Sequence, residues 1–533
     1  MSRSQNSKVG ATNKERQPGT HLETSRHFLK CRQRPPLLRL GLLTAIALAI
    51  HGYHLGVEDG EIYIPAVSKL IHPELFPYGA EFFQSHERLS LFASILAWTA
   101  RLTHLSTDTT IFLWYLVTLF ATLVSCWMLA ALCFSSPRAR WSAILAVTVA
   151  LTMPAANTGL LLMDPYVTAR SLSTPLTVFL LAAFLARRHI RAILLAVITA
   201  VVHPQMAVYL LLLIAILWIA EKVRPVAVQT SAAAAVAFLP PDYRFATAQG
   251  PYREALHARD FYFLFTWTWY DWLGLIAPLA ILGWFWKAKP RGTTPVFSRL
   301  CLGLIPFGLI SILAAAIISS SHIFDMFARL QPLRCFHLVT LVFLIFLGGV
   351  IGEYAAALNR WIVPVLCIGV AGLMFFVERQ IYPASPHIEW PWVQNTSNAW
   401  LNTLLWVRHN TPRDAVFAVD SRYFNDAGVD KHGFRAVSRR STLADYFKDG
   451  GAVAIFPALA DEWKQMSDAT YGLNQFTAAD FMRLAQRYPV TWAVIHGPTP
   501  AGMDCPYQRQ GYAVCKIPGA PGIAAQPSGV HNP

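Results

Sequence analysis

The sequence predicts a polytopic α-helical membrane protein with about 11 transmembrane helices, followed by a soluble α/β domain on the outer face. Two observations carry this prediction. Of the 533 residues, 54% are hydrophobic and only 14% are charged, whereas a soluble domain carries about 25% charged residues. The apolar residues also form long runs, and roughly 20 apolar residues suffice for a helix to cross a bilayer. This composition excludes a disordered chain and disfavours an ordinary soluble enzyme.

The N-terminal segment, residues 1–36, is predicted to be a disordered basic tail in the cytoplasm. Residues 1–39 contain nine Lys and Arg but two acidic residues, and positively charged flanks resist translocation. This tail supplies half of the net charge of +14, so the charge reports orientation and not nucleic-acid binding. The first apolar run lacks a small-residue cleavage site, and no cleavable signal peptide is expected.

The transmembrane region is predicted over residues 37–378, with a first outer loop at 56–109. The short apolar stretch 89–103 ends near Arg101 and His104, and we interpret it as an interfacial or re-entrant helix. Counting it as a span would place the basic turns on the outside. The candidate spans are 38–55, 110–134, 141–162, 171–186, 191–204, 206–220, 226–240, 263–286, 300–320, 333–352 and 361–378.

Charge sorts the turns between these spans into two classes. Together with the tail, the turns assigned to the cytoplasm hold 21 basic and 4 acidic residues, and the rest of the chain holds 23 basic and 26 acidic residues. This asymmetry follows the positive-inside rule. It predicts a multi-pass protein of the cell (inner) membrane with a cytoplasmic N-terminus and a periplasmic or extracytoplasmic C-terminal domain.

The C-terminal region changes composition and is predicted to form an α/β domain over residues 379–518, with a disordered end at 519–533. Residues 385–533 contain 13 basic and 12 acidic residues, and their length suits one compact domain. Thr477, with Asp480 three residues later, is typical of a helix start. The expected elements are helices at 400–409, 442–447 and 477–486 and strands at 415–420, 453–456, 491–495 and 512–517.

Cys505 and Cys515 are the only cysteine pair in the exported domain. The segment 506–511 between them is expected to turn the chain back as a hairpin. An oxidising compartment favours a disulfide there. The other six cysteines lie in apolar runs, beside them or in the tail, where a small buried residue is the default interpretation.

Placing an ionisable group at or near the depth of the membrane costs free energy, so such a group indicates a functional role. Glu58, Asp59 and Glu61 follow the first span directly. Carboxylates this close repel one another, which raises a pKa or recruits a cation. They suit a divalent metal or a base that deprotonates a hydroxyl nucleophile. A solvated acidic patch that only helps to fix orientation is the plain alternative.

Further polar groups fall in the other predicted outer turns. Asp164 precedes Pro165 and is either a turn initiator or part of a site. Arg329 and Arg334 are either lipid-headgroup anchors or a grip on a phosphate, for which a guanidinium is well shaped. The other candidates in these turns are Arg170, His203 and Gln205. Together these carboxylates, arginines and the histidine are the kinds of groups that an enzyme needs to bind a phosphate leaving group and to activate a nucleophile beside it.

Three motifs resemble the GT-C superfamily of integral-membrane glycosyltransferases, and in overall look the chain is similar to uncharacterised bacterial multi-pass members. The first motif opens the first outer loop, the second precedes and follows a span, and the third leads into the exported domain. They are Glu58-Asp59-Gly60-Glu61; Asp164-Pro165-Tyr166 with Ala169-Arg170-Ser171 and the later His203-Pro204-Gln205; and Trp406-Val407-Arg408-His409-Asn410-Thr411-Pro412.

This resemblance implies transfer of a sugar from a polyprenyl-phosphate or polyprenyl-diphosphate donor to an acceptor at the outer face. Asp59, with Glu58 or Glu61, would be the base or a metal ligand, and Asp164 a second acidic residue of the centre. Arg329 or Arg334 would contact the donor phosphate, with Arg170, His203 and Gln205 also at the substrate. Asp59, Glu61 and Asp164 would hold Mg²⁺ or Mn²⁺ if a metal is needed. The second loop, however, has one lone acid and not a pair.

The implied partners are membrane lipids, the lipid-linked sugar and a glycan, lipid or protein acceptor, but no nucleic acid. Two other classes compete with the transferase. One is a transporter or flippase, for which Asp271 is the best candidate for a coupling carboxylate inside a membrane span. The other is a non-catalytic envelope-assembly protein whose exported domain binds a partner.

Overall fold

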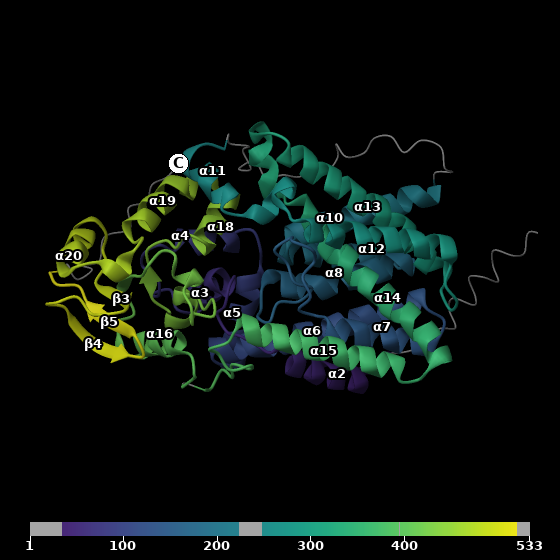
Figure 1. Ribbon diagram of the computed structural model, residues 1–533, viewed down its shortest axis with the longest axis horizontal. Helices are drawn as coiled ribbons and strands as arrows, with labels where there is room; N and C mark the ends of the chain where they lie inside the picture. Colours follow the sequence, from purple (N-terminus) through teal and green to yellow (C-terminus); the bar gives the residue numbers. More distant parts are fainter. Residues whose placement is uncertain (1–34, 223–247, 394, 520–533) are drawn as a thin grey trace, which may run out of the picture. The chain divides into compact units, whose positions relative to one another are not determined.

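The computed structural model describes residues 35–222, 248–393 and 395–519. By its internal contacts the chain from Leu37 onward is one unit, and Figure 1 shows its elements. The predicted basic tail, the predicted span at 226–240 and the predicted disordered end lie outside the described residues, apart from their edges.

Five described segments are helical, long and apolar enough to cross a membrane, and one of them, His322–Ala355, includes most of α14. Three further helices are apolar but shorter. These helices indicate a membrane protein, although they do not confirm eleven spans. The long ones are α6 (Thr107–Cys133), α10 (Pro204–Lys222), α13 (Pro295–Ser319), α14 (Phe336–Leu358) and α15 (Ile362–Ile381), and the short ones are α2 (Leu37–His51), α8 (Ala169–Leu185) and α9 (His189–Val202).

The predicted span at 141–162 is wrong in its second half. Helix α7 (Pro137–Val149) ends at Val149, and residues 150–168 contain no helix. Pro154 has no N–H to donate and disfavours a helical conformation at the residue before it. The helix therefore stops, and the irregular segment that follows carries Asp164 to the start of α8.

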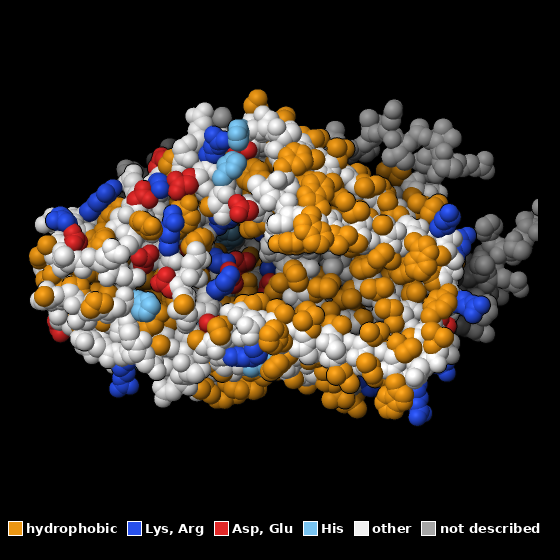
Figure 2. All heavy atoms as spheres, viewed as in Figure 1, with side chains coloured by type: hydrophobic (Ala, Val, Ile, Leu, Met, Phe, Trp, Pro, Cys, Tyr) orange, Lys and Arg blue, Asp and Glu red, His pale blue; other side chains and the backbone are white. Residues whose placement is uncertain are grey.

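Apolar side chains face outward on long and short apolar helices alike, as lipid-facing residues do. Ile190 of α9 is 77% exposed, Ile368 of α15 is 72% exposed and Leu313 of α13 is 62% exposed. Figure 2 shows hydrophobic side chains over the region of α12 (Trp269–Ala288), α14 and α15, whereas charged side chains gather toward the sheet and in the hollow beside it.

The basic turns of the bundle meet at one end, which we call the basic end. Arg187 and Arg299 both pair with Glu221, the latter at 2.6 Å between Nη1 and Oε1. The turns at Ser135 and Gly292 are joined by a backbone hydrogen bond of 2.8 Å. The loops that carry Asp59, Asp164, His203 and Arg334 lie at the opposite helix ends, which we call the site end.

Short helices fill the site end. Helix α5 (Phe92–Thr103), predicted as interfacial, has 12 residues, or about 18 Å, which is short of a hydrocarbon core of about 30 Å. The other elements are α3 (Gly60–Ile71), α4 (Glu81–Glu87), α11 (Gly250–His257), η2 (Asp260–Tyr262), η3 (Leu264–Thr266), η4 (His322–Leu330) and η5 (Pro332–Cys335).

The C-terminal domain is built on a five-stranded sheet of order β2-β1-β3-β5-β4. β1 pairs parallel with β2 and β3, and β5 pairs antiparallel with β3 and β4. The strands are β1 (Val416–Ala418), β2 (Ser441–Thr442), β3 (Trp492–His496), β4 (Asp504–Arg509) and β5 (Tyr512–Lys516); the helices are α16 (Ala399–Asn410), η6 (Tyr423–Asn425), α17 (Phe434–Ser438), α18 (Lys448–Ile455), η7 (Pro457–Leu459), α19 (Ala460–Ala469), η8 (Leu473–Gln475) and α20 (Ala478–Arg487).

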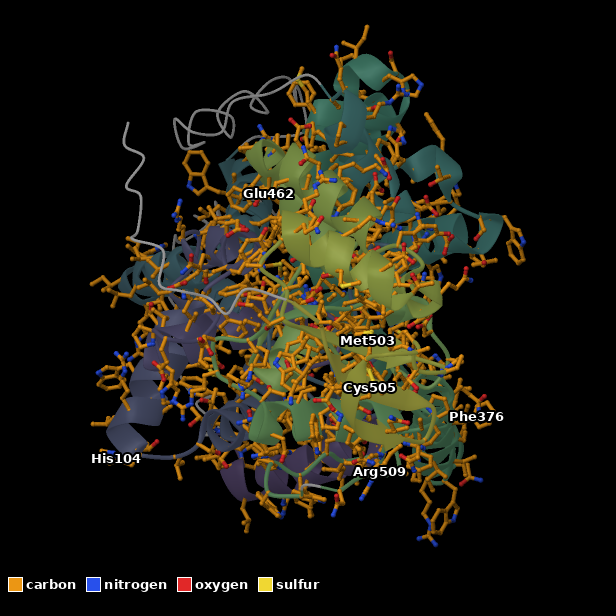
Figure 3. The ribbon with its side chains drawn as sticks, turned by 90° about the vertical axis from the view of Figure 1, so that its left-hand side faces the viewer. His104, Phe376, Glu462, Met503, Cys505 and Arg509 are labelled. Atoms are coloured by element: carbon orange, nitrogen blue, oxygen red, sulfur yellow. A yellow bond between two sulfur atoms is a disulfide. The ribbon has the colours of Figure 1, made fainter. Side chains whose placement is uncertain are left out.

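Several predicted elements of this domain are present and two are wrong. The helix expected at 477–486 is α20, and Thr477 and Asp480 form its capping box. Residues 453–455 of the expected strand lie in helix α18. The expected helix at 442–447 is absent: Thr442 ends β2, and residues 443–447 are irregular and lead into α18. The predicted hairpin is the β4–β5 pair, and a disulfide joins Cys505 to Cys515 (Figure 3).

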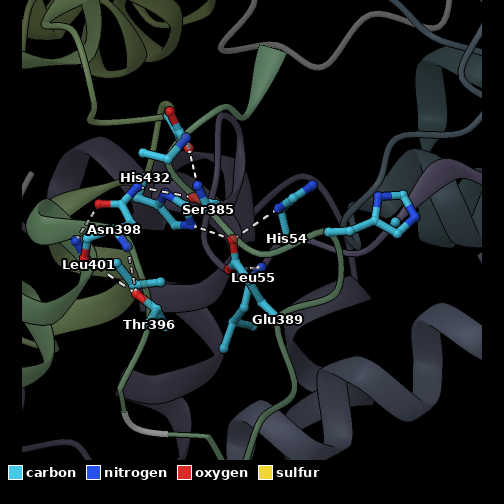
Figure 4. Close-up of polar contacts among 12 residues, drawn as sticks. His54, Leu55, Ser385, Glu389, Thr396, Asn398, Leu401 and His432 are labelled. Atoms are coloured by element: carbon cyan, nitrogen blue, oxygen red, sulfur yellow. Dashed lines mark hydrogen bonds and ion pairs between the residues drawn. The ribbon is translucent and has the colours of Figure 1, made fainter. Parts of the chain in front are cut away.

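A buried network of histidine and glutamate joins the end of α2 to the C-terminal domain (Figure 4). His54 contacts Glu378 at 2.8 Å through Nε2. It contacts Glu389 at 2.9 Å through Nδ1. His432 reaches the same Glu389 oxygen at 2.9 Å. Because carboxylates accept at both His54 nitrogens, the ring carries two protons and a positive charge.

Candidate functional site

The acidic motif is held by the backbone of the C-terminal domain. The N–H of Glu58 donates to the carbonyl of Lys431 at 2.9 Å, and the N–H of Gly433 donates to Gly56 at 2.8 Å. Glu58 adopts a φ of +49°, which a residue with a Cβ rarely holds unless its surroundings impose it. Two segments far apart in the sequence thus fix the position of the motif.

Lys448 of α18 binds both leading carboxylates of the motif. Its Nζ lies 3.1 Å from an Asp59 oxygen and also pairs with Glu58. Lys431 pairs with the second oxygen of Glu58 at 2.7 Å. Burial disfavours the charge on Lys448, but Glu58 and Asp59 outweigh it and raise the pKa of the amine. The side chain of Asp59 remains 41% exposed, so it is open to a ligand.

Glu61, which the sequence predicted as a catalytic residue, does not lie in this open site. Its side chain is fully buried and accepts from Arg435 Nε at 2.8 Å and from the Ala436 N–H at 2.8 Å. Asp449 binds the same guanidinium at 2.5 Å. Glu61 therefore fastens α3 to the C-terminal domain. The guanidinium of Arg435 faces three buried carboxylates and cannot balance all of their charges. Burial and the charge of Asp449 therefore raise the pKa of Asp445 well above its usual range.

Asp164 and Arg170 form a buried ion pair on either side of the α8 capping box, in which Thr168 and Ser171 exchange side-chain and backbone hydrogen bonds. The guanidinium of Arg170 also acts on Asp59. Burial alone would raise the pKa of Asp59, but the charges of Lys448, Arg170 and Arg334 hold it well below its usual range. The carboxylate is therefore ionised and surrounded by cations.

Arg334 has no counter-ion among the described residues. It forms no ion pair with them, and its buried Nε has no hydrogen-bond partner. Its guanidinium lies 5.9 Å from the ring centroid of Phe261 and lines a pocket with Thr158, Tyr262 and Gln331. An unpaired guanidinium in such a position is suited to a phosphate.

The remaining predicted residues divide into those at the centre and those that support it. His203 lies at the centre: burial and the charges of Arg170 and Arg334 lower its pKa to about 3. The Met206 N–H donates to its Nδ1 at 3.4 Å, so the neutral ring presents Nε2–H.

Gln205 and Arg329 do not present open groups there. Gln205 donates to the Tyr209 hydroxyl at 2.7 Å and to the carbonyl of Leu330 at 3.2 Å, which holds the η4–η5 turn. Arg329 is 3% exposed. Of the two arginines predicted to contact a phosphate, the structure therefore leaves Arg334 available.

Three residues of the centre escaped prediction from the sequence. Lys448 comes from the C-terminal domain, and His86 and Arg259 come from α4 and from the segment after α11. Burial lowers the pKa of His86 to about 4, and its buried Nδ1 has no hydrogen-bond partner among the described residues. Arg259 donates to the carbonyl of Ala255 at 3.2 Å and also to that of Phe447. A single charged residue in a soluble stretch gives no signal in the sequence.

The predicted metal site at Asp59, Glu61 and Asp164 does not fit the arrangement. Each carboxylate already has a basic partner: Lys448, Arg435 and Arg170 respectively. Their oxygens also do not meet in a group that one ion could bind, among the residues that the structure describes. A carboxylate that is neutralised by a buried cation is a poor ligand for Mg²⁺ or Mn²⁺.

Asp271, the deep carboxylate of the transporter hypothesis, caps the first turn of α12. Its Oδ2 accepts from the Thr268 N–H at 3.0 Å and from the Thr268 hydroxyl at 2.7 Å. An N-terminal cap of this kind stabilises a helix. The structure thus gives this residue a role at the end of a helix and not in its middle.

Comparison with known proteins identifies no relative: no protein-family model matches the chain, and no curated protein sequence matches it. The site must therefore be judged on its own chemistry. It holds a partly exposed, ionised carboxylate, a neutral histidine and several cations, of which Arg259 and Arg334 form no ion pair with the described residues. That arrangement can bind an anion and accept a proton beside it.

Proposed function

We propose that this protein is a glycosyltransferase of the GT-C type, which moves a sugar from a polyprenyl-phosphate-type donor to an acceptor at the outer face of the membrane. One observation carries the proposal: Arg334, which forms no ion pair with the described residues, is close enough to the partly exposed carboxylate of Asp59 to help lower the pKa of that carboxylate. An anion site beside a base is what transfer from a phosphate leaving group requires.

The proposed topology has about 11 spans, a cytoplasmic N-terminus and a periplasmic or extracytoplasmic C-terminal domain in a bacterial inner membrane. The gathering of Arg187, Arg299 and neighbouring turns at the basic end supports it, because basic turns stay in the cytoplasm. The opposite end, with Asp59 and Arg334, then faces outward.

The donor lipid would approach the site from the bilayer. Its isoprenoid chain would lie along exposed apolar helix faces, such as that of α9, and its phosphate would reach the helix ends at Arg334. The guanidinium would donate to two phosphate oxygens, and Lys448 would add a second positive charge. The phosphate is thereby held at the border between lipid and the polar site end.

Asp59 would act as the general base. The acceptor hydroxyl gives its proton to the Asp59 carboxylate while its oxygen forms a bond to the anomeric carbon of the sugar. The bond from that carbon to the phosphate oxygen breaks, and the electron pair leaves with the phosphate. Arg334 and Lys448 stabilise the negative charge that develops. Phosphate binding also offsets the field of these cations, which raises the pKa of Asp59 and makes it a better base.

Two features support a transferase over the competing classes. The capping role of Asp271 removes the best candidate for a coupling carboxylate of a transporter. An assembly protein, in turn, has no need for a partly exposed carboxylate that neighbouring cations keep ionised. The transporter and the assembly protein each predict a different outcome from the transferase when Asp59 is substituted.

The test is complementation of a deletion strain with Asp59→Asn, with Glu74→Gln as the matched carboxylate-to-amide control. Glu74 follows the same motif, and its side chain is 49% exposed. We expect mass spectrometry of surface glycans and lipids to show the deletion profile with Asp59→Asn and the wild-type profile with Glu74→Gln.

Full restoration by Asp59→Asn would contradict the transferase proposal and favour the assembly role. Loss of uptake of a solute with Asp271→Ala, together with a normal glycan profile for Asp59→Asn, would favour a transporter. Protein levels and membrane insertion must match the wild type in each strain.

A further inference from the structure

A second polar cluster lies at the site end, on α11 and η4, outside the group formed by Asp59 and Arg334. His257 ends α11, whereas His322 and Asp325 lie three residues apart in η4. One ligand atom from each of the three residues lies within 4.8 Å of the other two. It is the one group of three such side chains that the described residues contain. Figure 2 shows histidine, basic and acidic side chains near α11.

The distances in this cluster fit a shared metal ion. Asp325 Oδ2 lies 2.8 Å from His257 Nε2 and 3.5 Å from His322 Nδ1. Donors bound to one ion at about 2.0–2.2 Å lie about 3.0–3.5 Å apart, whether the geometry is tetrahedral or octahedral. The three side chains therefore need only small movements to close on an ion.

The environment of each ligand also suits an ion. The carboxylate of Asp325 is 3% exposed, and a buried carboxylate requires a cation. The ring of His257 stacks on Phe263, with centroids 4.4 Å apart and an angle of 8° between the planes, which fixes its orientation. His322 is 73% exposed, so an ion bound here keeps a side open to water or to another ligand.

Arg253 occupies the open side of the cluster. Its Nη2 donates to His322 Nδ1 at 2.8 Å, and its Nε lies 3.4 Å from Asp325 Oδ2. The Nδ1 lone pair of His322 therefore already points into the cluster. The arginine side chain is 43% exposed, so it has room to turn toward solvent and leave the carboxylate of Asp325 to another cation.

We infer that His257, His322 and Asp325 form a site for a divalent transition metal of the zinc type, with Arg253 as the competing cation in its absence. Two imidazoles and one carboxylate select Zn²⁺, Co²⁺ or Ni²⁺ over Mg²⁺ and Ca²⁺, which prefer oxygen ligands. The bound ion crosslinks α11 to η4, the element that precedes Arg334. This inference does not depend on the proposed glycosyltransferase activity.

The experiment is a titration of the purified full-length chain in detergent with Co²⁺, after chelator treatment and without a polyhistidine tag. Visible d–d absorption bands report ligation. We expect one saturable equivalent for the wild type, loss of this equivalent or at least about tenfold weaker binding for His322→Ala and Asp325→Asn, and tighter binding for Arg253→Ala. His72→Ala, at a partly exposed histidine beside Glu74, should bind as the wild type does.

His322→Ala removes an exposed side chain, so its effect cannot be ascribed to misfolding as that of Asp325→Asn could. Absence of a saturable equivalent in both the wild type and Arg253→Ala would overturn the inference. So would Co²⁺ binding that is unchanged in His322→Ala, because the ion would then be bound elsewhere.

Discussion

At the scale of single residues, the site depends on the balance between Asp59 and the cations around it. Lys448 of the C-terminal domain is the closest of these cations, at 3.1 Å, although it lies 389 residues after Asp59 in the chain. The field of Lys448 and of two arginines keeps Asp59 ionised. The acidity of the proposed base is therefore set from the C-terminal domain.

This balance predicts a change in the pH profile of Lys448→Met. Lys448 lowers the pKa of Asp59, so its removal raises that pKa. Because the base must be ionised to accept a proton, activity should be lost at a higher pH on the acidic side than in the wild type, even where the maximal rate is also reduced. The measurement is the rate of sugar transfer in membranes as a function of pH.

Lys464→Met is the matched control, because Lys464 pairs with Glu254 and Asp468 and not with Asp59. Its acidic limb should coincide with that of the wild type. An acidic limb of Lys448→Met that does not move would show that Asp59 is not the group whose ionisation limits the rate.

The sequence predicts part of this centre and misses the rest for a physical reason. Asp59, Arg170 and Arg334 stand out because charged groups beside apolar helices are costly. Lys448 and Arg259 lie in stretches where a charge is ordinary, so only the folded chain shows their role. Glu61 has the same sequence signal as Asp59, and its burial against Arg435 cannot be read from the motif.

At the scale of elements, the packing of α3 against α17 is held by one buried ion pair. Glu61 and Arg435 are both about 1% exposed through their side chains. Gly433 allows this approach, since a Cβ on it would lie 2.2 Å from Glu61 Oε2. Removing one partner of a buried pair costs roughly 3–5 kcal/mol.

Gly433→Ala should therefore loosen the contact between α3 and the C-terminal domain. The new methyl group forces the carboxylate away from Arg435, so we expect a lower thermal unfolding midpoint and faster cleavage by protease in the 379–448 region. Gly369→Ala, at a glycine whose added Cβ would meet nothing within 4 Å, is the control. Equal stability of the two variants would contradict the proposed role of Glu61.

Prediction of elements succeeds where local chemistry decides and fails where packing decides. The Thr477–Asp480 box identifies α20 because the cap is made within four residues. The residues 453–456 are apolar and short, which suits a strand or a buried helix equally well. Residues 453–455 form the end of α18, and the buried Val453 and Ala454 pack in the core of the C-terminal domain.

At the scale of the whole molecule, the network of His54, Glu389 and His432 joins the bundle to the C-terminal domain. Burial opposes a charge on His54, but the hydrogen bonds that its ring donates to Glu378 and Glu389 outweigh this effect and raise its pKa above 6.5. Burial likewise opposes a charge on Glu389, but His432 and His54 lower its pKa from 4.5 to about 2.

The network should make stability depend on pH in both directions. The contribution of His54 is complete below about pH 6.5 and is lost as the pH rises through its raised pKa; the contribution of Glu389 is complete above about pH 4.5 and is lost as the pH falls toward 2. We expect the unfolding midpoint of the detergent-solubilised protein to peak between these values. In His54→Gln the decline on the alkaline side should be weaker, and an unchanged decline would refute this account.

The charge distribution of the whole chain predicts which loops lie on the same side of the membrane. In a background without reactive native cysteines, Glu74→Cys and Arg188→Cys should react with an impermeant maleimide from opposite faces, since they lie at the site end and at the basic end. Labelling of intact cells should modify Glu74→Cys only. Modification of both from one face would place the basic turns outside and contradict the proposed topology.

The count and the arrangement of spans were only partly predictable at this scale. Long apolar helices such as α13 follow from hydropathy alone. The shortened α7 does not, because the run of apolar residues continues past Pro154 and hides the end of the helix. The resulting irregular segment brings Asp164 to Arg170, which no hydropathy pattern could show.

The central claim is that Arg334 provides a phosphate site beside Asp59, and binding of a short-chain polyprenyl phosphate tests it most directly. Native mass spectrometry of the purified protein would count bound lipid for the wild type, for Arg334→Ala and for Arg291→Ala as a basic-end control. We predict one bound lipid for the wild type and for Arg291→Ala, and at least about tenfold weaker binding for Arg334→Ala, in keeping with the loss of a charge-assisted hydrogen-bonded pair. Equal binding by Arg334→Ala and the wild type would contradict the account.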